Sequence, residues 1–172
     1  MRTGDIVFFR RHGVIQSLIR FGSWLGAKVR REPVPDWIPH HVEIVVLHDG
    51  VAYLYGADAV AGFVRRPHYF RLNRLTDGKH YRVIRLDLWG KLDDIREAVT
   101  QLEGTPYEQW RKVLRTWREG NTHDSADRVF CSEAIVRVLQ AADVSWVCPL
   151  DPENTTPMEL YLKCLKHGAA KD

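Results

Sequence analysis

The central stretch of the sequence, residues 41–55, reads HVEIVVLHDGVAYLY. Its first half is rich in β-branched side chains, which favour an extended strand over residues 42–47. Asp49-Gly50 is a pair typical of a tight two-residue turn, and residues 51–55 continue as a second apolar segment. The stretch therefore predicts an antiparallel hairpin at the centre of a sheet.

Segments on either side of the hairpin predict the rest of the fold. Residues 6–9 and 80–88 have the apolar content of further strands, and residues 28–40 contain three prolines and form a loop. Apolar residues at helical spacing predict helices over residues 13–26, 91–103, 107–118, 130–142 and 158–165. This order predicts a single α+β domain over residues 1–172, with an antiparallel sheet packed against helices.

Composition excludes several classes of protein. The 172 residues are 45% hydrophobic and 27% charged, with a net charge of +3, which excludes a disordered chain, a collagen-like repeat and a disulfide-dense mini-protein. Residues 1–85 carry 14 basic and 7 acidic side chains, whereas residues 86–172 carry 11 and 15. The basic half suits an anionic substrate. The mild overall charge and the lack of a known motif argue against a nucleic-acid partner.

The cysteines predict neither disulfides nor a metal site. There are three, Cys131, Cys148 and Cys164, an odd number with no close pair, so we expect free thiols and no metal or other cofactor. The sequence starts without a secretory signal and contains no apolar run near the roughly 20 residues that cross a bilayer. We therefore expect a cytoplasmic protein without a transmembrane segment.

Cys131 is the thiol best placed for chemistry. It follows a polar loop and lies in the first turn of the helix predicted over residues 130–142. The unpaired N–H groups at a helix N-terminus favour the thiolate, which is the nucleophilic form of cysteine. Cys148, beside a proline, and Cys164, on the apolar face of the last helix, are interpreted as structural.

A nucleophilic cysteine needs a base, and the sequence offers the pair His40-His41 at the start of the central strand. A histidine at a strand end has a fixed backbone and a ring at the edge of the core, which suits a general base. Alternation along the strand places His41 and Glu43 on the same face.

Three motifs in a fixed order carry a resemblance to a known family. They are Gly4-Asp5-Ile6-Val7, His41-Val42-Glu43-Ile44-Val45 and Phe130-Cys131-Ser132-Glu133. Together they resemble the circularly permuted NlpC/P60 group of papain-like cysteine hydrolases, the YiiX/YebB type. The segments LEGTPY at residues 102–107 and TPMEL at residues 156–160 resemble two further elements of that group.

The resemblance implies a papain-like fold in which Cys131 is the nucleophile and His41 its base. His40 occupies the position where the group usually has Ser or Thr, so the base is ambiguous by one residue. The group often has an orienting glutamate on the next strand, where this sequence has Gly56. Asp58, two residues further on, is the first candidate for the orienting role, and Glu43 is the second.

The leading hypothesis is a cysteine hydrolase that cleaves an amide bond through an acyl-enzyme, in a peptidoglycan-type peptide or a small amide. A lipid acyltransferase or thioesterase on the same fold is the alternative enzyme class, since Trp24, Leu25, Trp37 and Ile38 are suited to contact acyl chains. A non-catalytic binding module is the third hypothesis, because the usual glutamate is missing. Tyr53, Tyr55 and Tyr107 are further candidates to line the site.

Overall fold

The fold is described from a computed structural model, which describes residues 1–10, 17, 20–21, 24–25, 28, 31, 34–58, 60–73, 75–107 and 130–170. All but the first residue of the helix predicted over residues 107–118, and most of the one over residues 13–26, lie outside these residues. The described elements, in chain order, are β1 (Ile6–Phe9), β2 (His41–His48), β3 (Val51–Asp58), β4 (Gly62–Pro67), α2 (His68–Leu72), β5 (Tyr81–Leu86), α3 (Leu92–Leu102), α5 (Cys131–Ala141), α6 (Pro157–His167) and β6 (Gly168–Ala170).

Within the described residues, six strands form one sheet in the order β4-β3-β2-β1-β5-β6, and each neighbouring pair is antiparallel. The predicted hairpin is confirmed: β2 and β3 pair from Ile44↔Tyr55 to His48↔Val51, with the turn at Asp49 and Gly50. Asp49 and Gly50 both have positive φ, 50° and 76°, as a tight hairpin turn of this kind requires. The α+β class predicted from the sequence is therefore confirmed.

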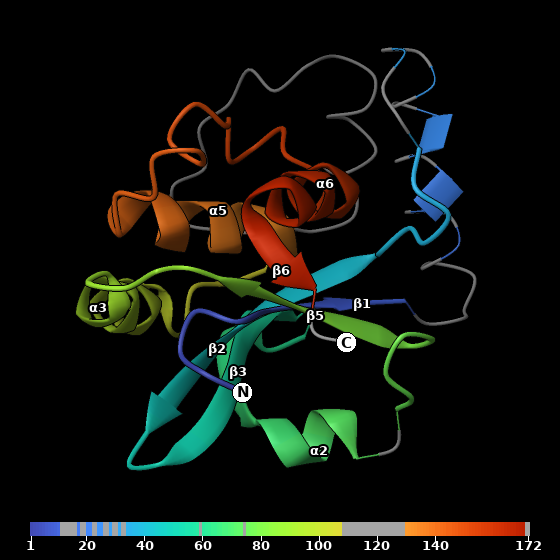
Figure 1. The fold of residues 1–172 in the computed structure, drawn as a ribbon. Helices are drawn as coiled ribbons and strands as arrows, with labels where there is room; N and C mark the ends of the chain where they lie inside the picture. Colours follow the sequence, from blue (N-terminus) through green and yellow to red (C-terminus); the bar gives the residue numbers. More distant parts are fainter. Residues whose placement is uncertain are drawn as a thin grey trace.

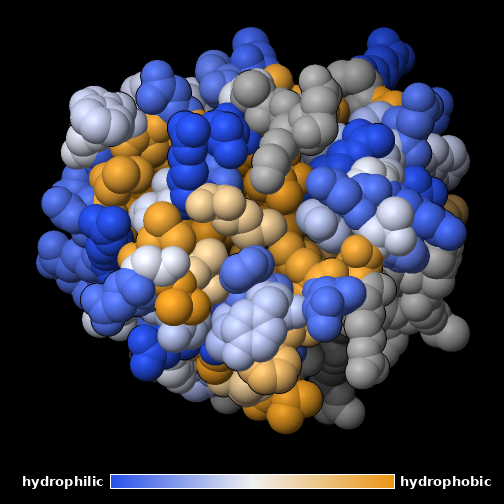
Figure 2. All heavy atoms as spheres, turned by 60° about the horizontal axis from the view of Figure 1, so that its bottom comes forward, coloured by the Kyte–Doolittle hydropathy of each residue, from blue (hydrophilic) through white to orange (hydrophobic). Residues whose placement is uncertain are grey.

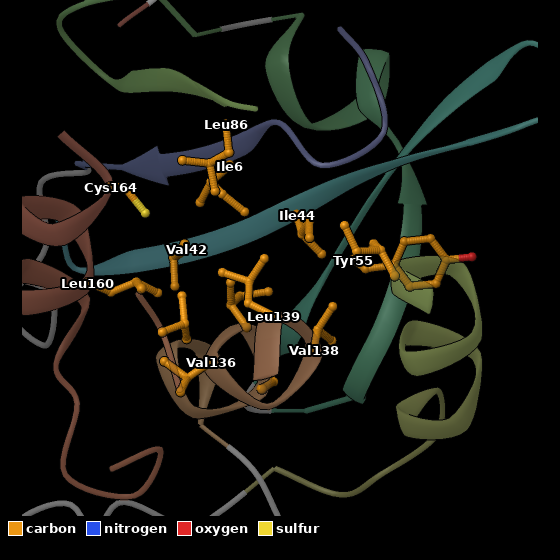
Figure 3. Close-up of a cluster of buried hydrophobic side chains, with 14 of the residues drawn as sticks. Ile6, Val42, Ile44, Tyr55, Leu86, Val136, Val138, Leu139, Leu160 and Cys164 are labelled. Carbon is orange, nitrogen blue, oxygen red and sulfur yellow. The ribbon is translucent and has the colours of Figure 1, made fainter. Parts of the chain in front are cut away.

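The helices divide unequally between the two faces of the sheet (Figure 1). α3, α5 and α6 cover one face, and the short helix α2 lies on the other. Figure 3 shows Val136, Val138 and Leu139 of α5 beside Val42 and Ile44 of β2, in the larger of two apolar clusters. Burying these branched side chains, at about 25 cal/mol for each Å² of apolar surface, fixes the position of α5 against the sheet.

The second apolar cluster lies on the α2 side, where alternate residues of the same strands point. It includes Val7, Phe9 and Val45 from the sheet and Leu72 from α2. Figure 2, which brings this side forward, shows apolar side chains between hydrophilic ones across the surface. The sheet is therefore apolar on both faces, but only one face is covered by long helices.

The last helix, α6, begins with a capped first turn. Thr156 is the N-cap: its hydroxyl accepts a hydrogen bond from the Glu159 N–H at 3.2 Å, and Pro157 occupies the first turn. Tyr161, in the middle of α6, packs its ring edge-on against Phe8 of β1 at 5.1 Å between centroids. None of the helices among the described residues has the length and apolarity needed to span a membrane.

The end of the proline-rich loop is fixed by Trp37, whose side chain is buried. Its ring lies 5.3 Å from that of Tyr161, and the Arg82 guanidinium lies over it at 4.9 Å. The indole N–H donates to the Lys79 carbonyl at 3.4 Å. Trp37 thus ties the segment that leads into β2 to α6 and β5, four residues before His41.

Candidate active site

His41 is the first residue of β2, and the sheet holds its backbone. It pairs with Phe9 of β1, and the His40 N–H donates to the Phe9 carbonyl at 2.9 Å. The His41 ring lies 5.7 Å from the Phe9 ring, and its side chain is 14% exposed. The imidazole is therefore supported from its own strand and from β1, and it retains a small opening to solvent.

Glu43 reaches His41 along the same strand. Its Oε1 atom lies 2.9 Å from Nε2 of His41, and its side chain is only 1% exposed. Burial alone would raise the pKa of the Glu43 carboxyl. The hydrogen bond from His41, and the charges of His41, Arg71 and Arg66, instead hold that pKa below its ordinary value. The shared face predicted by alternation thus places an ionised carboxylate against the imidazole.

Cys131 is the third residue of the site, and it comes from helix α5 rather than from strand β2. It is the first residue of α5 and is 6% exposed, and its side chain interacts with the His41 ring. Burial lowers the pKa of His41, but hydrogen bonds and charges from Cys131 and Glu43 outweigh burial and raise it to about 9. The imidazolium is therefore the favoured form of His41 at neutral pH.

The N-terminus of α5 is organised by Glu133. Its Oε2 atom accepts the Phe130 N–H at 3.1 Å, and its Oε1 atom lies 2.7 Å from Nη2 of Arg137. Phe130 is extended, so the helix begins directly at Cys131. Glu133 therefore serves the helix start, and Cys131 lies where the helix dipole favours a thiolate.

Asp58 is not the carboxylate that reaches His41, which corrects the first choice made from the sequence. Its carboxylate lies 3.0 Å from Nη2 of Arg66 and accepts the N–H groups of Val60 and Ala61. These contacts hold the turn between β3 and β4. Strand alternation alone could not decide whether Asp58 or Glu43 contacts His41. It predicts on which face of the sheet a side chain lies, but not which charged side chains it pairs with.

Gly56 explains why Glu43 fits. A β-carbon at position 56 would lie 2.5 Å from Cγ of Glu43 and 3.3 Å from its Cβ and Cδ. The Glu43 side chain therefore crosses the space that any side chain at position 56 would need. The position where the resembled group often has glutamate is glycine here, and the carboxylate comes from the neighbouring strand instead.

Replacing Gly56 with alanine is expected to lower the free energy of unfolding by about 1–3 kcal/mol, because the new methyl group must displace the buried Glu43 side chain. Urea denaturation measures the change. In a Glu43→Ala background the same replacement should cost much less, since the clashing atoms are gone. An equal loss of stability in both backgrounds would show that the Glu43 side chain is not the reason why position 56 requires glycine.

Tyr107 is the tyrosine that comes near Cys131. Its ring packs edge-on against Phe130 at 6.1 Å, and burial, with the charges of Cys131 and Asp58, raises the pKa of its hydroxyl. The segment before it is tied to β4, because the Phe63 N–H donates to the Thr105 carbonyl at 2.7 Å. The Tyr107 phenol is therefore neutral, and its ring packs against the residue before Cys131.

The other sequence candidates lie elsewhere. The Tyr55 ring is buried in the core and its hydroxyl lies 2.8 Å from Nε2 of His48, while Tyr53 has the Arg65 guanidinium over its ring. All three cysteines are free. Burial raises the pKa of the Cys164 thiol well above its ordinary value, and Cys148 is exposed. Cys131 is the cysteine whose side chain interacts with the His41 ring.

Comparisons with known proteins support the fold at a distance. No model of a known protein family matches the chain, and no curated protein matches it. A crystal structure of YiiX from Escherichia coli O157:H7, a DUF1105 protein described as a metalloprotein, matches with a TM-score of 0.55 and 19% identity. The match covers 82% of this chain and 66% of that one. The two chains share a YiiX-like fold.

Because that neighbour is described as a metalloprotein, we tested the residues here for a metal site. The described residues contain no group of three or more His, Cys, Asp or Glu side chains placed to hold a metal ion. The Oε1 atom of Glu43 also lies 3.0 Å from Nη2 of Arg71, and a guanidinium at that distance opposes a second cation on the same oxygen. The described residues of this site therefore do not fit a metal.

Proposed function

We propose that the protein is a cysteine hydrolase of the permuted NlpC/P60 type, a peptidase or amidase that cleaves an amide bond. The observation that carries the proposal is the chain of contacts from Cys131 to His41 to Glu43. It combines a thiol at a helix N-terminus, an imidazole that is protonated at neutral pH and a buried ionised carboxylate. Nucleophilic catalysis by cysteine uses this combination.

In the proposed reaction, His41 holds the proton of Cys131 as an imidazolium, and the thiolate attacks the carbonyl carbon of the amide. The N–H groups at the start of α5, including that of Cys131, stabilise the oxyanion that forms. His41 then gives its proton to the leaving amine, and the C–N bond breaks to leave a thioester on Cys131. His41 takes a proton from water, the resulting hydroxide attacks the thioester, and the C–S bond breaks to release the acid and restore the thiolate of Cys131 and the imidazolium of His41.

Glu43 acts in this scheme through His41. Its carboxylate fixes the orientation of the ring at 2.9 Å and stabilises the imidazolium, as the acidic member of a catalytic triad does. Because Glu43 is buried, solvent screens this interaction weakly.

The proposed substrate is a peptidoglycan-type peptide or a related small amide that carries carboxylates. The resemblance to the NlpC/P60 group and the basic first half of the chain support this choice. A cytoplasmic location remains a prediction from the sequence.

A lipid acyltransferase or thioesterase is the second candidate, and exposed apolar side chains favour it. Phe21 and Trp24 are 57% and 37% exposed, with their rings stacked at 5.8 Å, and Leu25 is 46% exposed. Trp37 does not belong to this group, because it is buried against Tyr161.

Incubation with muropeptides, phospholipids and acyl thioesters in parallel separates these candidates. The proposed function predicts new amine and carboxyl termini from muropeptides, with no release by the Cys131→Ala variant. Acyl transfer or thioester cleavage without peptide cleavage would replace the amidase with the second candidate. Activity that survives unchanged in Cys131→Ala, or binding without turnover, would contradict both and favour a non-catalytic binding module.

A further inference from the structure

We propose that Arg71 of α2 is a positioning residue of the cysteine site, which holds the Glu43 carboxylate against His41 and balances its charge. This inference rests on the proposed role of Cys131. It means that α2, on the face of the sheet opposite α5, contributes to the cysteine site.

The contact geometry couples Arg71 to His41 through one atom. Oε1 of Glu43 lies 2.9 Å from Nε2 of His41 and 3.0 Å from Nη2 of Arg71. Oε2 of Glu43 is buried and has no hydrogen-bond partner among the described residues. A change in the Arg71 contact therefore acts on the same oxygen that orients the imidazole.

Arg71 is itself held in place by the sheet. Its guanidinium lies over the Phe9 ring at 5.4 Å, and the same ring lies 5.7 Å from that of His41. Leu72, the next residue, is buried in the apolar cluster on this face. At the start of α2, Nδ1 of His68 lies 3.1 Å from the carbonyl of Ala52 in β3. These contacts fix a helix of only five residues on the side of the sheet opposite α5 (Figure 1).

The charges around the site nearly cancel when Arg71 is present. Arg71 balances Glu43, and Arg66 is paired with Asp58; in the proposed reaction the His41 imidazolium balances the thiolate of Cys131. Tyr107 adds no charge, because its hydroxyl remains protonated. Among the described residues, the titratable and charged groups that act on the site are His41 and Glu43 of β2, Asp58 of β3, Arg66 of β4, Arg71 of α2, Cys131 of α5 and Tyr107.

Removing the Arg71 charge leaves this cluster with an unbalanced negative charge, and Glu43 is almost completely buried. An unpaired buried charge is costly, so the cluster is expected to take up a proton. Protonation of Glu43 weakens the imidazolium, and protonation of Cys131 removes the thiolate directly. Both routes lower the fraction of reactive thiolate at neutral pH.

The test is the pH dependence of iodoacetamide labelling at Cys131, resolved from the other cysteines by peptide mass spectrometry. Arg71→Met should move the midpoint of labelling upward by about one pH unit or more, which is a tenfold loss of thiolate below the midpoint. Arg71→Lys keeps the charge, so its midpoint should shift much less than that of Arg71→Met and lie near the wild-type value. Arg96→Met, which removes a surface ion pair with Asp93 on α3, is the matched control and should leave the midpoint unchanged.

The double variant Glu43→Gln/Arg71→Met separates charge balance from a structural effect. It removes both charges, so its midpoint should lie closer to wild type than that of Arg71→Met alone. An unchanged midpoint in Arg71→Met, or equal shifts in all three Arg71 variants, would overturn the inference while leaving the proposed function intact. If His41→Ala fails to slow labelling of Cys131, the proposed function itself fails, and the role of Arg71 fails with it.

Discussion

Replacing His41 with alanine is expected to lower the rate of Cys131 acylation by para-nitrophenyl acetate by about a thousandfold. In the proposed reaction the ring holds the proton of Cys131 and stabilises the thiolate, and a positioned acid–base group contributes roughly 10²–10⁴-fold. The burst of para-nitrophenol and the mass of the acetyl-enzyme measure the rate. Cys131→Ala should show no acetyl-enzyme at that residue.

His40 provides the matched comparison, because it is the adjacent histidine and the sequence left the choice between the two open. The structure pairs His41 with Glu43. His40→Ala should therefore reduce the acylation rate much less than His41→Ala. A larger loss in His40→Ala than in His41→Ala would contradict the assignment.

The same histidine sets the expected pH dependence of amide cleavage. The pKa of His41 is raised to about 9, so the imidazolium is present below that pH and is lost as the pH rises through it. Cleavage that needs this proton for the leaving amine should fall above about pH 9, whereas alkylation of the thiolate should not. Parallel pH profiles of both reactions check the difference.

Replacing Trp37 with alanine is expected to lower the free energy of unfolding by about 3–5 kcal/mol, the range measured for buried large-to-small replacements. The variant loses the ring contacts with Tyr161 and Arg82 and leaves a cavity between α6 and β5. Urea denaturation gives the value. Trp37→Phe should cost less, because it keeps a ring in the same space.

Trp89→Ala is the control for that measurement. Trp89 is 91% exposed, so its replacement should change the free energy of unfolding by no more than about 0.5 kcal/mol. Equal costs for Trp37→Ala and Trp89→Ala would show that Trp37 does not anchor the segment before His41.

The hairpin, the cap of the last helix and the shared face of His41 and Glu43 were predictable from the sequence. Each depends on residues close together in the chain: the Asp49-Gly50 turn, Thr156-Pro157 and the alternation along β2. Local rules of backbone conformation are sufficient for such features.

The strands β4 and β6 were not predicted, because their sequences do not favour strands. β4 combines a glycine with an Arg-Arg-Pro end, and β6 consists of Gly168, Ala169 and Ala170. Pairing with β3 and β5 determines their conformation. Tertiary context thus overrides weak local preference at both edges of the sheet.

Two parts of the site also depend on distant residues. In the sequence, Gly56 indicated that the usual carboxylate was missing. The reason for the glycine becomes clear only from the neighbouring strand β2, where the Glu43 side chain fills the space that a side chain at position 56 would need. Arg71 reaches the same carboxylate from α2, a helix too short to show a periodic pattern. A glutamate inside an apolar strand was nevertheless a usable signal, because a buried carboxylate requires charged partners.

The most direct test of an activated Cys131 is a site-resolved comparison of its iodoacetamide labelling rate with that of Cys148 at neutral pH. Cys131 is 6% exposed, whereas Cys148 is exposed, so accessibility alone favours Cys148. The Cys131–His41–Glu43 arrangement predicts that Cys131 reacts faster and that His41→Ala removes this advantage. Faster labelling of Cys148 in the wild-type protein, or an undiminished Cys131 rate in His41→Ala, would contradict it.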